Sequence, residues 1–331
     1  MTTTSPLNEA SLTELQTSMA RLRDTVGRRV VGQDRVIEQL LVCLLGGGHG
    51  LFVGVPGLAK TLLVRSVAES LGLSFSRIQF TPDLMPADVL GSEVLEEDRD
   101  SGQRSFRFLQ GPVFAQLLLA DEINRTPPKT QSALLQAMQE KTVTVGGKDH
   151  GLPQPFHVFA TQNPIEQEGT YPLPEAQLDR FMMQIRVAYP SAEEELAIAQ
   201  LSHRELDEPL EAVLSTDELV AFQALVESVA VDENLVRQAV DLVRSSRAGQ
   251  EAPDWVGEHI RWGAGPRASQ FLLQACRARA LLHGRAAADR DDLRALAPSV
   301  LGHRLVPSFR AESEGLSGED LAKRLLEDQR D

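Results

Sequence analysis

One stretch of the chain has the residue types and spacing of a loop that binds phosphate. It consists of Gly54, Val55, Pro56, Gly57, Leu58, Ala59, Lys60 and Thr61. It matches the pattern G-x-x-x-x-G-K-[ST] except that Ala59, a small side chain, replaces the second glycine. In such a loop Lys60 reaches the β- and γ-phosphates and Thr61 offers its hydroxyl to Mg²⁺, while backbone N–H groups and a helix dipole attract the anion. An ordinary Gly/Pro turn is the alternative, but the strand and helix expected on either side favour the phosphate loop.

Two acids directly follow the apolar run Leu117–Ala120. If this run is a buried strand, Asp121 and Glu122 lie at its carboxyl end, where ligands bind in open α/β sheets. Asp121 is then expected to hold Mg²⁺, and Glu122 to act as the general base for an attacking water. Two solvated acids at a strand end are the alternative, which the phosphate loop upstream disfavours.

Three further side chains could complete a hydrolytic site, although each has an ordinary alternative. Asn163 follows an expected strand and could orient the water from the side opposite Glu122, but Asn-Pro alone is only a turn. Arg180 precedes another expected strand, and Arg267 opens a helix in the C-terminal part. An isolated arginine is usually a partner in a surface ion pair.

The elements that would position these residues alternate between strands and helices up to about residue 190. Strands are expected at 50–54, 74–80, 116–120, 158–161 and 182–187, and helices at 11–28, 34–45, 60–71 and 127–140. This alternation predicts an α/β fold, with a parallel sheet covered by helices on both faces. Two hairpins interrupt it, one at 92–108 with a polar tip and one at 142–153.

The strand patterns end after Tyr189-Pro190. Helical patterns follow at 193–204, 217–229, 233–244, 267–282, 290–296 and 318–327. We therefore expect two domains: residues 1–189, with an N-terminal helix and the α/β core, and residues 190–331, an all-helical domain.

The composition is that of a globular protein and argues against several other classes of protein. Hydrophobic residues make up 42% and charged residues 24%, as in globular proteins, and the net charge of −14 argues against a protein that coats nucleic acid or anionic membrane. Two distant cysteines exclude a disulfide scaffold or a zinc cage. No apolar run reaches the ~18–20 residues that span a bilayer, and the first residues do not form a secretory signal, so a cytoplasmic location is expected.

Several longer strings closely resemble the MoxR family of AAA+ ATPases. They are Gly-Val-Pro-Gly-Leu-Ala-Lys-Thr at 54–61, Asp-Glu-Ile-Asn-Arg-Thr-Pro-Pro-Lys-Thr-Gln at 121–131, Thr-Gln-Asn-Pro at 161–164, Tyr-Pro-Leu-Pro-Glu-Ala-Gln-Leu-Asp-Arg-Phe at 171–181 and Gly-Pro-Arg-Ala at 265–268. The resemblance extends from Val30 to Arg304, nearly the whole chain. Within this family Ala59 is not a departure.

The resemblance implies a P-loop AAA+ core, an αβα sandwich whose five-stranded parallel sheet has the order 5-1-4-3-2, and a C-terminal helical lid. It implies ATP or ADP with Mg²⁺ as cofactors, bound by the Walker A loop at 54–61 together with Val31 and Gly32, with Thr61 and Asp121 as the metal ligands. Asp121 and Glu122 take the Walker B positions, Asn163 sensor 1, Arg180 the arginine finger and Arg267 sensor 2. Residues 83–108 resemble the helix-2 insert of one AAA+ clade, and residues 142–153 resemble its pre-sensor 1 hairpin. Relatives in this clade have a repositioned lid, so the resemblance leaves open whether Arg267 serves its own subunit or a neighbouring one.

The function implied is that of an ATPase that remodels or matures partner proteins, often with a protein that carries a von Willebrand factor A domain. If Arg180 reaches a neighbour's nucleotide, subunits form a head-to-tail ring, by resemblance a hexamer; the alternative is an ion pair with Asp179 or Glu175. A nucleic-acid-dependent motor of the same clade is a second hypothesis, but the second hairpin offers only Lys148 and His150, and the chain is acidic. A scaffold that does not hydrolyse ATP would require a damaged catalytic set, and the set is intact.

Overall fold

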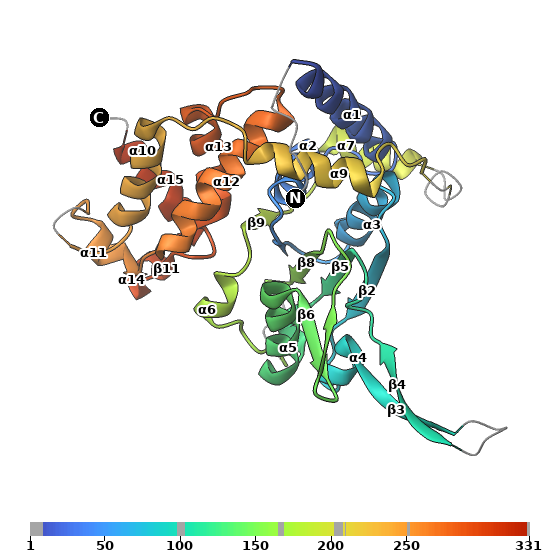
Figure 1. The fold of residues 1–331 in the computed structure, drawn as a ribbon. Coiled ribbons are helices and arrows are strands. Elements are labelled where there is room, and N and C mark those ends of the chain that lie inside the picture. The colour runs from blue at the N-terminus through green and yellow to red at the C-terminus, as the bar shows by residue number, and fades with distance from the viewer. Residues whose placement is uncertain are drawn as a thin grey trace.

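A parallel sheet between layers of helices forms the N-terminal half of the molecule, and a group of helices forms the C-terminal half (Figure 1). The computed structural model describes residues 9–97, 103–164, 169–201, 208, 210–249 and 252–329. A long hairpin projects away from the sheet, on the side remote from the C-terminal helices (Figure 1).

The central sheet has five parallel strands in the order β2-β5-β8-β1-β9. The strands are β1 (Gly50–Val53), β2 (Phe75–Gln79), β5 (Leu117–Asp121), β8 (His157–Gln162) and β9 (Met183–Arg186). Counted along the chain, this is the expected order 5-1-4-3-2, which is therefore confirmed. Only β8 separates β1 from β5, so the strands that carry the phosphate loop and the paired acids end close together at one edge.

Helices cover both faces of the sheet because its central strands are apolar on both sides. In β5, Leu117 and Leu119 belong to one hydrophobic cluster, and Leu118 and Ala120 to another. The first cluster includes residues of α1 (Glu9–Gly27), α2 (Asp34–Leu45), α3 (Lys60–Ser70) and the C-terminal helices; the second includes residues of α5 (Pro128–Glu140). The αβα layering that the alternation predicts is thus present.

Both interruptions of the α/β alternation are antiparallel hairpins. β3 (Gly91–Glu97) pairs with β4 (Arg104–Gln110), after the short helix α4 (Pro86–Leu90). Of the polar tip expected at 96–102, Glu96 and Glu97 belong to β3, and residues 98–102 lie outside the described part of the chain. β6 (Thr142–Val145) pairs with β7 (Lys148–Gly151). His150 on the second hairpin stacks on Phe108 of the first at 4.0 Å between ring centroids, so the two hairpins contact each other.

The C-terminal part is helical, with one addition that the sequence did not indicate. Within the described residues its helices are α7 (Ala192–Gln200), α9 (Thr216–Val226), α10 (Glu233–Ser245), α11 (Val256–His259), α12 (Pro266–Leu282), α13 (Arg290–Leu301), α14 (Phe309–Ser313) and α15 (Gly318–Asp328). Two very short strands, β10 (Ile260–Trp262) and β11 (Val306–Pro307), pair antiparallel. Strands this short contain too few residues to show an alternating pattern. The expected domain boundary near residue 190 stays a prediction.

The helix expected to end at Leu296 continues as α13 to Leu301, through Pro298. A proline inside a helix removes a backbone hydrogen bond. Here the last turn buries Val300 and Leu301 completely, and this apolar burial offsets the loss.

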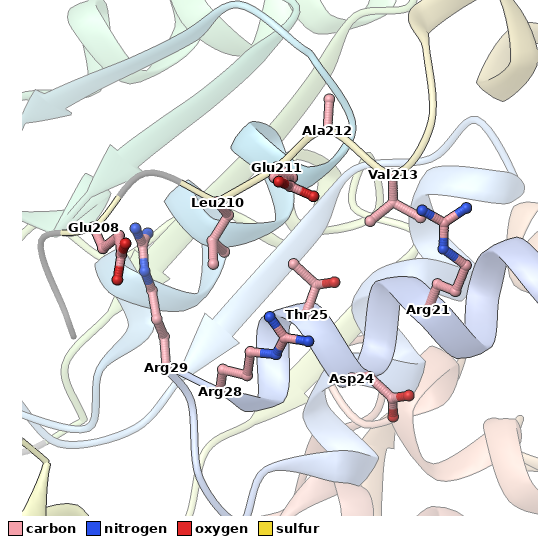
Figure 2. A pocket seen from close by; sticks show the side chains of 10 residues that line it. All are labelled: Arg21, Asp24, Thr25, Arg28, Arg29, Glu208, Leu210, Glu211, Ala212 and Val213. Atoms are coloured by element: carbon pink, nitrogen blue, oxygen red, sulfur yellow. The ribbon is translucent and has the colours of Figure 1, made fainter.

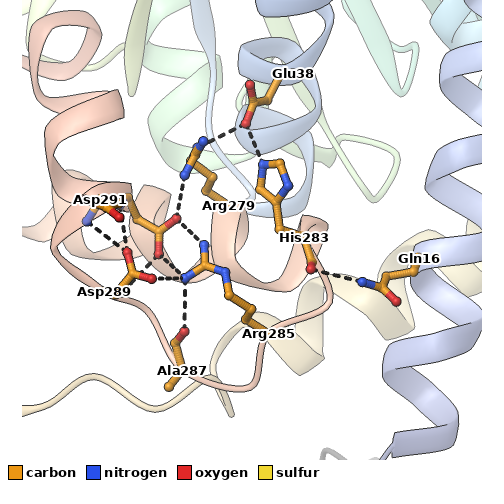
Figure 3. A network of polar contacts seen from close by, with 9 residues as sticks. Gln16, Glu38, Arg279, His283, Arg285, Ala287, Asp289 and Asp291 are labelled. Carbon is orange, nitrogen blue, oxygen red and sulfur yellow. Dashed lines mark hydrogen bonds and ion pairs between the residues drawn. The ribbon is translucent and has the colours of Figure 1, made fainter.

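A polar network joins the C-terminal helices to α2 (Figure 3). Asp292 of α13 is fully buried and accepts hydrogen bonds from Arg279 at 2.8 Å and from Arg285 at 2.9 Å. Arg279 also pairs with Glu38 of α2 at 3.0 Å, as does His283 at 2.8 Å. Burial alone would raise the pKa of Asp292, but hydrogen bonds from Arg285, the Asp289 backbone and Arg279 outweigh it and hold that pKa below its ordinary value.

Replacing Asp292 by alanine is therefore expected to destabilise the protein by about 3 kcal/mol, because two arginines lose a buried partner. The lower end of the usual range applies because Arg279 and Arg285 keep 20% and 33% exposure. Urea unfolding would measure the change. Asp291→Ala is the matched control, since Asp291 is 84% exposed and its pairing with Arg294 is long, at 3.9 Å; a similar loss in both variants would contradict a specific role for the buried network.

Two buried histidines connect the amino ends of β1 and β8. The His157 Nδ1–H donates to the Gly48 carbonyl at 2.9 Å, and His49 Nδ1 accepts from the Val158 N–H at 3.0 Å. Burial lowers the pKa of His49 to about 3 and that of His157 to about 4, so both rings are neutral in the folded protein.

The lowered pKa values of His49 and His157 predict that the protein loses stability in mild acid. In the unfolded chain each ring titrates near ~6.5, so below that pH the unfolded state binds more protons than the folded state. The free energy of unfolding should fall as pH drops from ~6.5 toward 4, by about 2–3 kcal/mol for the pair between pH 7.5 and 5.5. Urea midpoints at the two pH values would test this, and unchanged midpoints would contradict it.

Candidate functional site

The segment between β1 and α3 forms a tight loop that requires its glycines. Gly57 has φ +84°, in the left-handed region, and a Cβ on Gly54 would lie 2.6 Å from the Val187 carbonyl at the end of β9. Ala59 also has a left-handed backbone, with φ 55°, which explains why glycine is the commoner residue at its position in phosphate loops. α3 begins at Lys60, directly after the loop.

Lys60 joins this loop to the paired acids. Its Nζ donates to the carbonyls of Gly54 and Val55, both at 2.7 Å. Burial lowers the pKa of Lys60, and the negative charges of Asp121 and Glu122 oppose that shift. The ammonium therefore lies within electrostatic reach of both carboxylates, as the two motifs require if they act on one ligand.

The two acids are oriented by residues from two neighbouring strands and from the short 3-10 helix Ile123–Arg125. The Thr161 hydroxyl on β8 donates to Asp121 Oδ1 at 2.6 Å and accepts from the Glu122 N–H at 2.8 Å. Arg77 on β2 pairs with Asp121 Oδ2 at 2.6 Å. Gln79 at the end of β2 donates to Glu122 Oε2 at 2.7 Å, and Arg125 pairs with the same oxygen at 2.8 Å.

Four side chains that contact the acids were not among the residues expected at the site; they are Arg77, Gln79, Arg125 and Thr161. The expected strand order could have indicated Gln79, because it stands opposite Asp121 in the register of β2 and β5.

The donor set fits a magnesium ion held jointly with phosphate. Thr61 in the first turn of α3 supplies a hydroxyl, and Asp121 supplies a carboxylate. Mg²⁺ typically takes one or two protein carboxylates and completes its octahedron with phosphate oxygens and water. Among the described residues, no cluster of three or more His, Cys, Asp or Glu side chains could form an all-protein metal site.

Asn163 lies at the same edge of the sheet as the acids and the phosphate loop. It follows β8, whose last residue Gln162 stands opposite Val53 of β1, and its side chain is buried. The Gly54 N–H donates to the Gln162 carbonyl at 3.4 Å. Asn163 is thus next to the start of the loop, where sensor 1 was expected.

A cavity of about 240 Å³ is connected to the loop through Gln33, although none of residues 54–61 is among its lining residues. Gly32 and Gln33 line it on one side, and Ala188, Tyr189 and Pro190, which follow β9, line it on another. Gln33 also donates to the Leu58 carbonyl of the loop at 3.2 Å. This position next to the phosphate loop suits the base and ribose of a nucleotide. Of the two residues expected to bind the nucleotide ahead of the loop, Gly32 lines this cavity and Val31 does not.

Arg180 and Arg267 lie at the opposite edge of the sheet. Gly50, the first residue of β1, stands opposite Met183, the first residue of β9, so Arg180 precedes the strand at the end remote from the loop. The length of β1 alone separates the two edges by about 10 Å. Arg180 and Arg267 line one cavity of about 210 Å³ together with Lys141, which was not among the residues expected at the site.

The intrachain alternative for Arg180 is not observed. Among the described residues, Arg180 forms no ion pair with Asp179 or Glu175. Asp179 pairs instead with Arg267 at 3.3 Å and with Arg304 at 2.8 Å.

A polar cavity of about 630 Å³ lies elsewhere, between the end of α1 and residues 208 and 210–213 (Figure 2). Its walls carry arginines and acids in mixture, including Arg21, Arg28, Asp24 and Glu211. None of the expected site residues lines it. Because its charges are balanced, it favours no particular ligand.

Comparisons with known proteins decide the family. A model of the ATPase family associated with various cellular activities (AAA) matches residues 49–183, and a model of the AAA lid domain matches residues 254–325. The chaperone MoxR1 of Mycobacterium tuberculosis is 45% identical over 305 residues, which cover 91% of this chain and 79% of that protein. The chain belongs to the MoxR family of AAA+ ATPases. Its AAA+ core and helical C-terminal region are those of the family.

A further MoxR relative and a solved ATPase structure are also similar to this chain. The protein MoxR of Methylorubrum extorquens is 33% identical over 314 residues, with 90% of each chain covered. A crystal structure of a candidate ATPase from Cytophaga hutchinsonii is 39% identical and superimposes with a TM-score of 0.88 over 96% of both chains. No helix in the described part of this MoxR-family chain is long and apolar enough to cross a membrane.

Proposed function

We propose that this MoxR-family chain binds ATP with Mg²⁺ and hydrolyses it to ADP and phosphate. The observation that supports this most directly is that the phosphate loop, which follows β1, and the paired acids, which end β5, lie at the same edge of the sheet with only β8 between their strands. Residues 54–61 would bind the phosphates, Gly32 and the segment after β9 would border the base and ribose, and Val31 would support that wall. Thr61 and Asp121 would hold Mg²⁺, which when bound neutralises charge on the phosphate oxygens.

In this assignment Glu122 accepts the proton of the attacking water. The water oxygen forms a bond to the γ-phosphorus, the bond from that phosphorus to the β–γ bridging oxygen breaks, and ADP leaves with that oxygen. Asn163 would orient the water from the side of β8. The hydrogen bonds from Gln79 and Arg125 to Glu122 fix its carboxylate at the strand end.

Arg180 and Arg267 would act on the nucleotide of a neighbouring subunit. Their own phosphate loop lies at the other edge of the sheet, so a head-to-tail arrangement is needed to bring the two edges together. Such contacts close into a ring, for which we propose a hexamer. The ATPase site is then complete only at the interface between subunits.

For the cellular role we propose remodelling or maturation of partner proteins in the cytoplasm, with a protein that carries a von Willebrand factor A domain as the partner. The relative MoxR1 is named a chaperone, which supports this class of function. No observation favours the nucleic-acid motor: His150 of the second hairpin packs on Phe108, which leaves Lys148 as the basic residue there.

The test is the rate of phosphate release from ATP by the purified protein, measured with and without Mg²⁺. It is repeated with single-stranded DNA and with a von Willebrand factor A protein encoded beside its gene. Mg²⁺-dependent turnover that rises with the protein partner and not with DNA is the expected result. Stimulation by DNA alone would favour the motor.

A further inference from the structure

The turn that carries Arg180 is held by a buried arginine from the C-terminal part of the chain. The side chain of Arg304 is only 2% exposed, and each of its five N–H groups has an acceptor. Its Nε donates to Asp179 Oδ1 at 2.8 Å. The terminal nitrogens donate to the backbone carbonyls of Asp179, Phe181, Met182 and Val300. The guanidinium therefore fixes the backbone on both sides of Arg180.

Arg304 remains charged in this buried position because of Asp179. Burial lowers the pKa of Arg304 to about 10, and the hydrogen bond and negative charge of Asp179 oppose that shift. The guanidinium also lies 5.2 Å from the centroid of the Phe271 ring on α12. The ion pair between Arg304 and Asp179 thus joins the C-terminal helices to the turn that carries Arg180.

The same carboxylate also holds the second arginine. Asp179 Oδ2 accepts from Arg267 at 3.3 Å, and the Arg267 side chain keeps 43% exposure, so its other N–H groups can reach a further ligand. Arg180 and Arg267 line the far-edge cavity with Lys141, and no carboxylate is among the described residues that line it. That lining suits a phosphate group.

We propose that Asp179 and Arg304 are positioning residues that hold Arg180 and Arg267 as one unit facing the nucleotide of the neighbouring subunit. The inference rests on the proposed function of those two arginines. Arg304 sets the backbone of the turn, and Asp179 orients Arg267 while leaving part of its guanidinium for phosphate. Because misplacement of a catalytic group by ~1 Å can cost ~10² in rate, Asp179 and Arg304 control turnover without touching the nucleotide themselves.

The variant Asp179→Asn tests the proposal, since it keeps the size and one acceptor oxygen but removes the charge. Its kcat for ATP is expected to fall by about 10²-fold. Binding of a fluorescent ATP analogue to its own phosphate loop should stay within about twofold, because that loop lies at the other edge. Glu233→Gln is the matched control: it removes the charge of an exposed carboxylate–arginine pair, with Arg237 at 2.6 Å, and should keep the wild-type rate.

Mixed rings show whether Asp179→Asn disturbs only the position of the arginines or the structure of the whole subunit. Asp179→Asn subunits keep an intact phosphate loop, and Glu122→Gln subunits keep intact arginines, so an interface that joins the two intact halves should regain activity. A wild-type rate for Asp179→Asn overturns the proposal. The proposal is also overturned if Asp179→Asn and Glu122→Gln subunits form mixed rings that regain no activity, although mixed rings of Arg180→Ala and Glu122→Gln subunits do regain it.

Failure of that second mixture would instead overturn the shared site on which the inference rests. If Asp179→Asn forms no rings, Arg304→Lys replaces it in the same mixture. The Arg304→Lys variant keeps the positive charge but loses most of the hydrogen bonds to the turn. A wild-type rate for this variant, or mixed rings with Glu122→Gln that regain no activity, would overturn the proposal.

Discussion

Replacing Glu122 by glutamine is expected to lower the rate of ATP hydrolysis by ~10²–10⁴, while ATP still binds. The amide keeps the shape of the side chain and an oxygen that can accept from Gln79 and Arg125, but it cannot take a proton from water. Phosphate release would measure turnover, and a fluorescent ATP analogue would measure binding. Glu140→Gln, the same chemical change at the exposed end of α5, should leave both values unchanged.

Lys60→Ala provides the contrast to this variant. It removes the positive charge that lies against Gly54 and Val55 and would face the phosphates, so it should lose ATP binding itself. Equal loss of binding in Lys60→Ala and Glu122→Gln would contradict the division of roles between the loop and the acid.

Replacing Arg180 by alanine is expected to lower turnover by ~10³–10⁵, the range for an arginine finger. The physical reason is that the finger neutralises charge on the neighbour's γ-phosphate as the bond breaks. The subunit should still bind ATP, since its own phosphate loop lies at the other edge of the sheet. Steady-state kinetics and the fluorescent analogue would separate these two effects.

Mixing shows whether Arg180 acts between subunits. Arg180→Ala and Glu122→Gln subunits are each expected to be inactive alone, but some interfaces of a mixed ring join an intact Glu122 to an intact Arg180. Activity should return in part at intermediate ratios. Rings that form, as seen by light scattering, but stay inactive at every ratio would show that Arg180 does not act in trans.

The sequence predicted the sheet well because its strands are defined by local chemistry. The runs 51–53 and 117–120 are continuously apolar, with Gly50 and Gly54 on either side of the first and Gln116 and Asp121 on either side of the second, so both were visible without tertiary information. The observed strands β1 and β5 agree to within one residue at each end. Helix α13 was predicted too short because Pro298 is a local indication of a helix end, whereas burial of the following turn is a tertiary effect.

The partners of the catalytic groups could not be predicted in the same way. Gln79 and Arg125 reach Glu122 only because β2 pairs with β5 and a short 3-10 helix follows the strand. Asp179 and Arg304 are far apart in the sequence, and their ion pair depends on how the C-terminal helices pack against the turn before β9. Nothing in the residues near either one indicates this contact.

By itself the sequence determined which residues could do chemistry: a phosphate loop, two acids at a strand end, and two arginines in strings typical of the MoxR family. Only the tertiary structure decided how these groups divide. The loop and acids lie at the carboxyl edge, and Arg180 and Arg267 at the opposite edge. The reason is strand direction: in a parallel sheet, residues that follow strands gather at one edge and residues that precede them at the other. One chain therefore carries two half-sites that face in different directions.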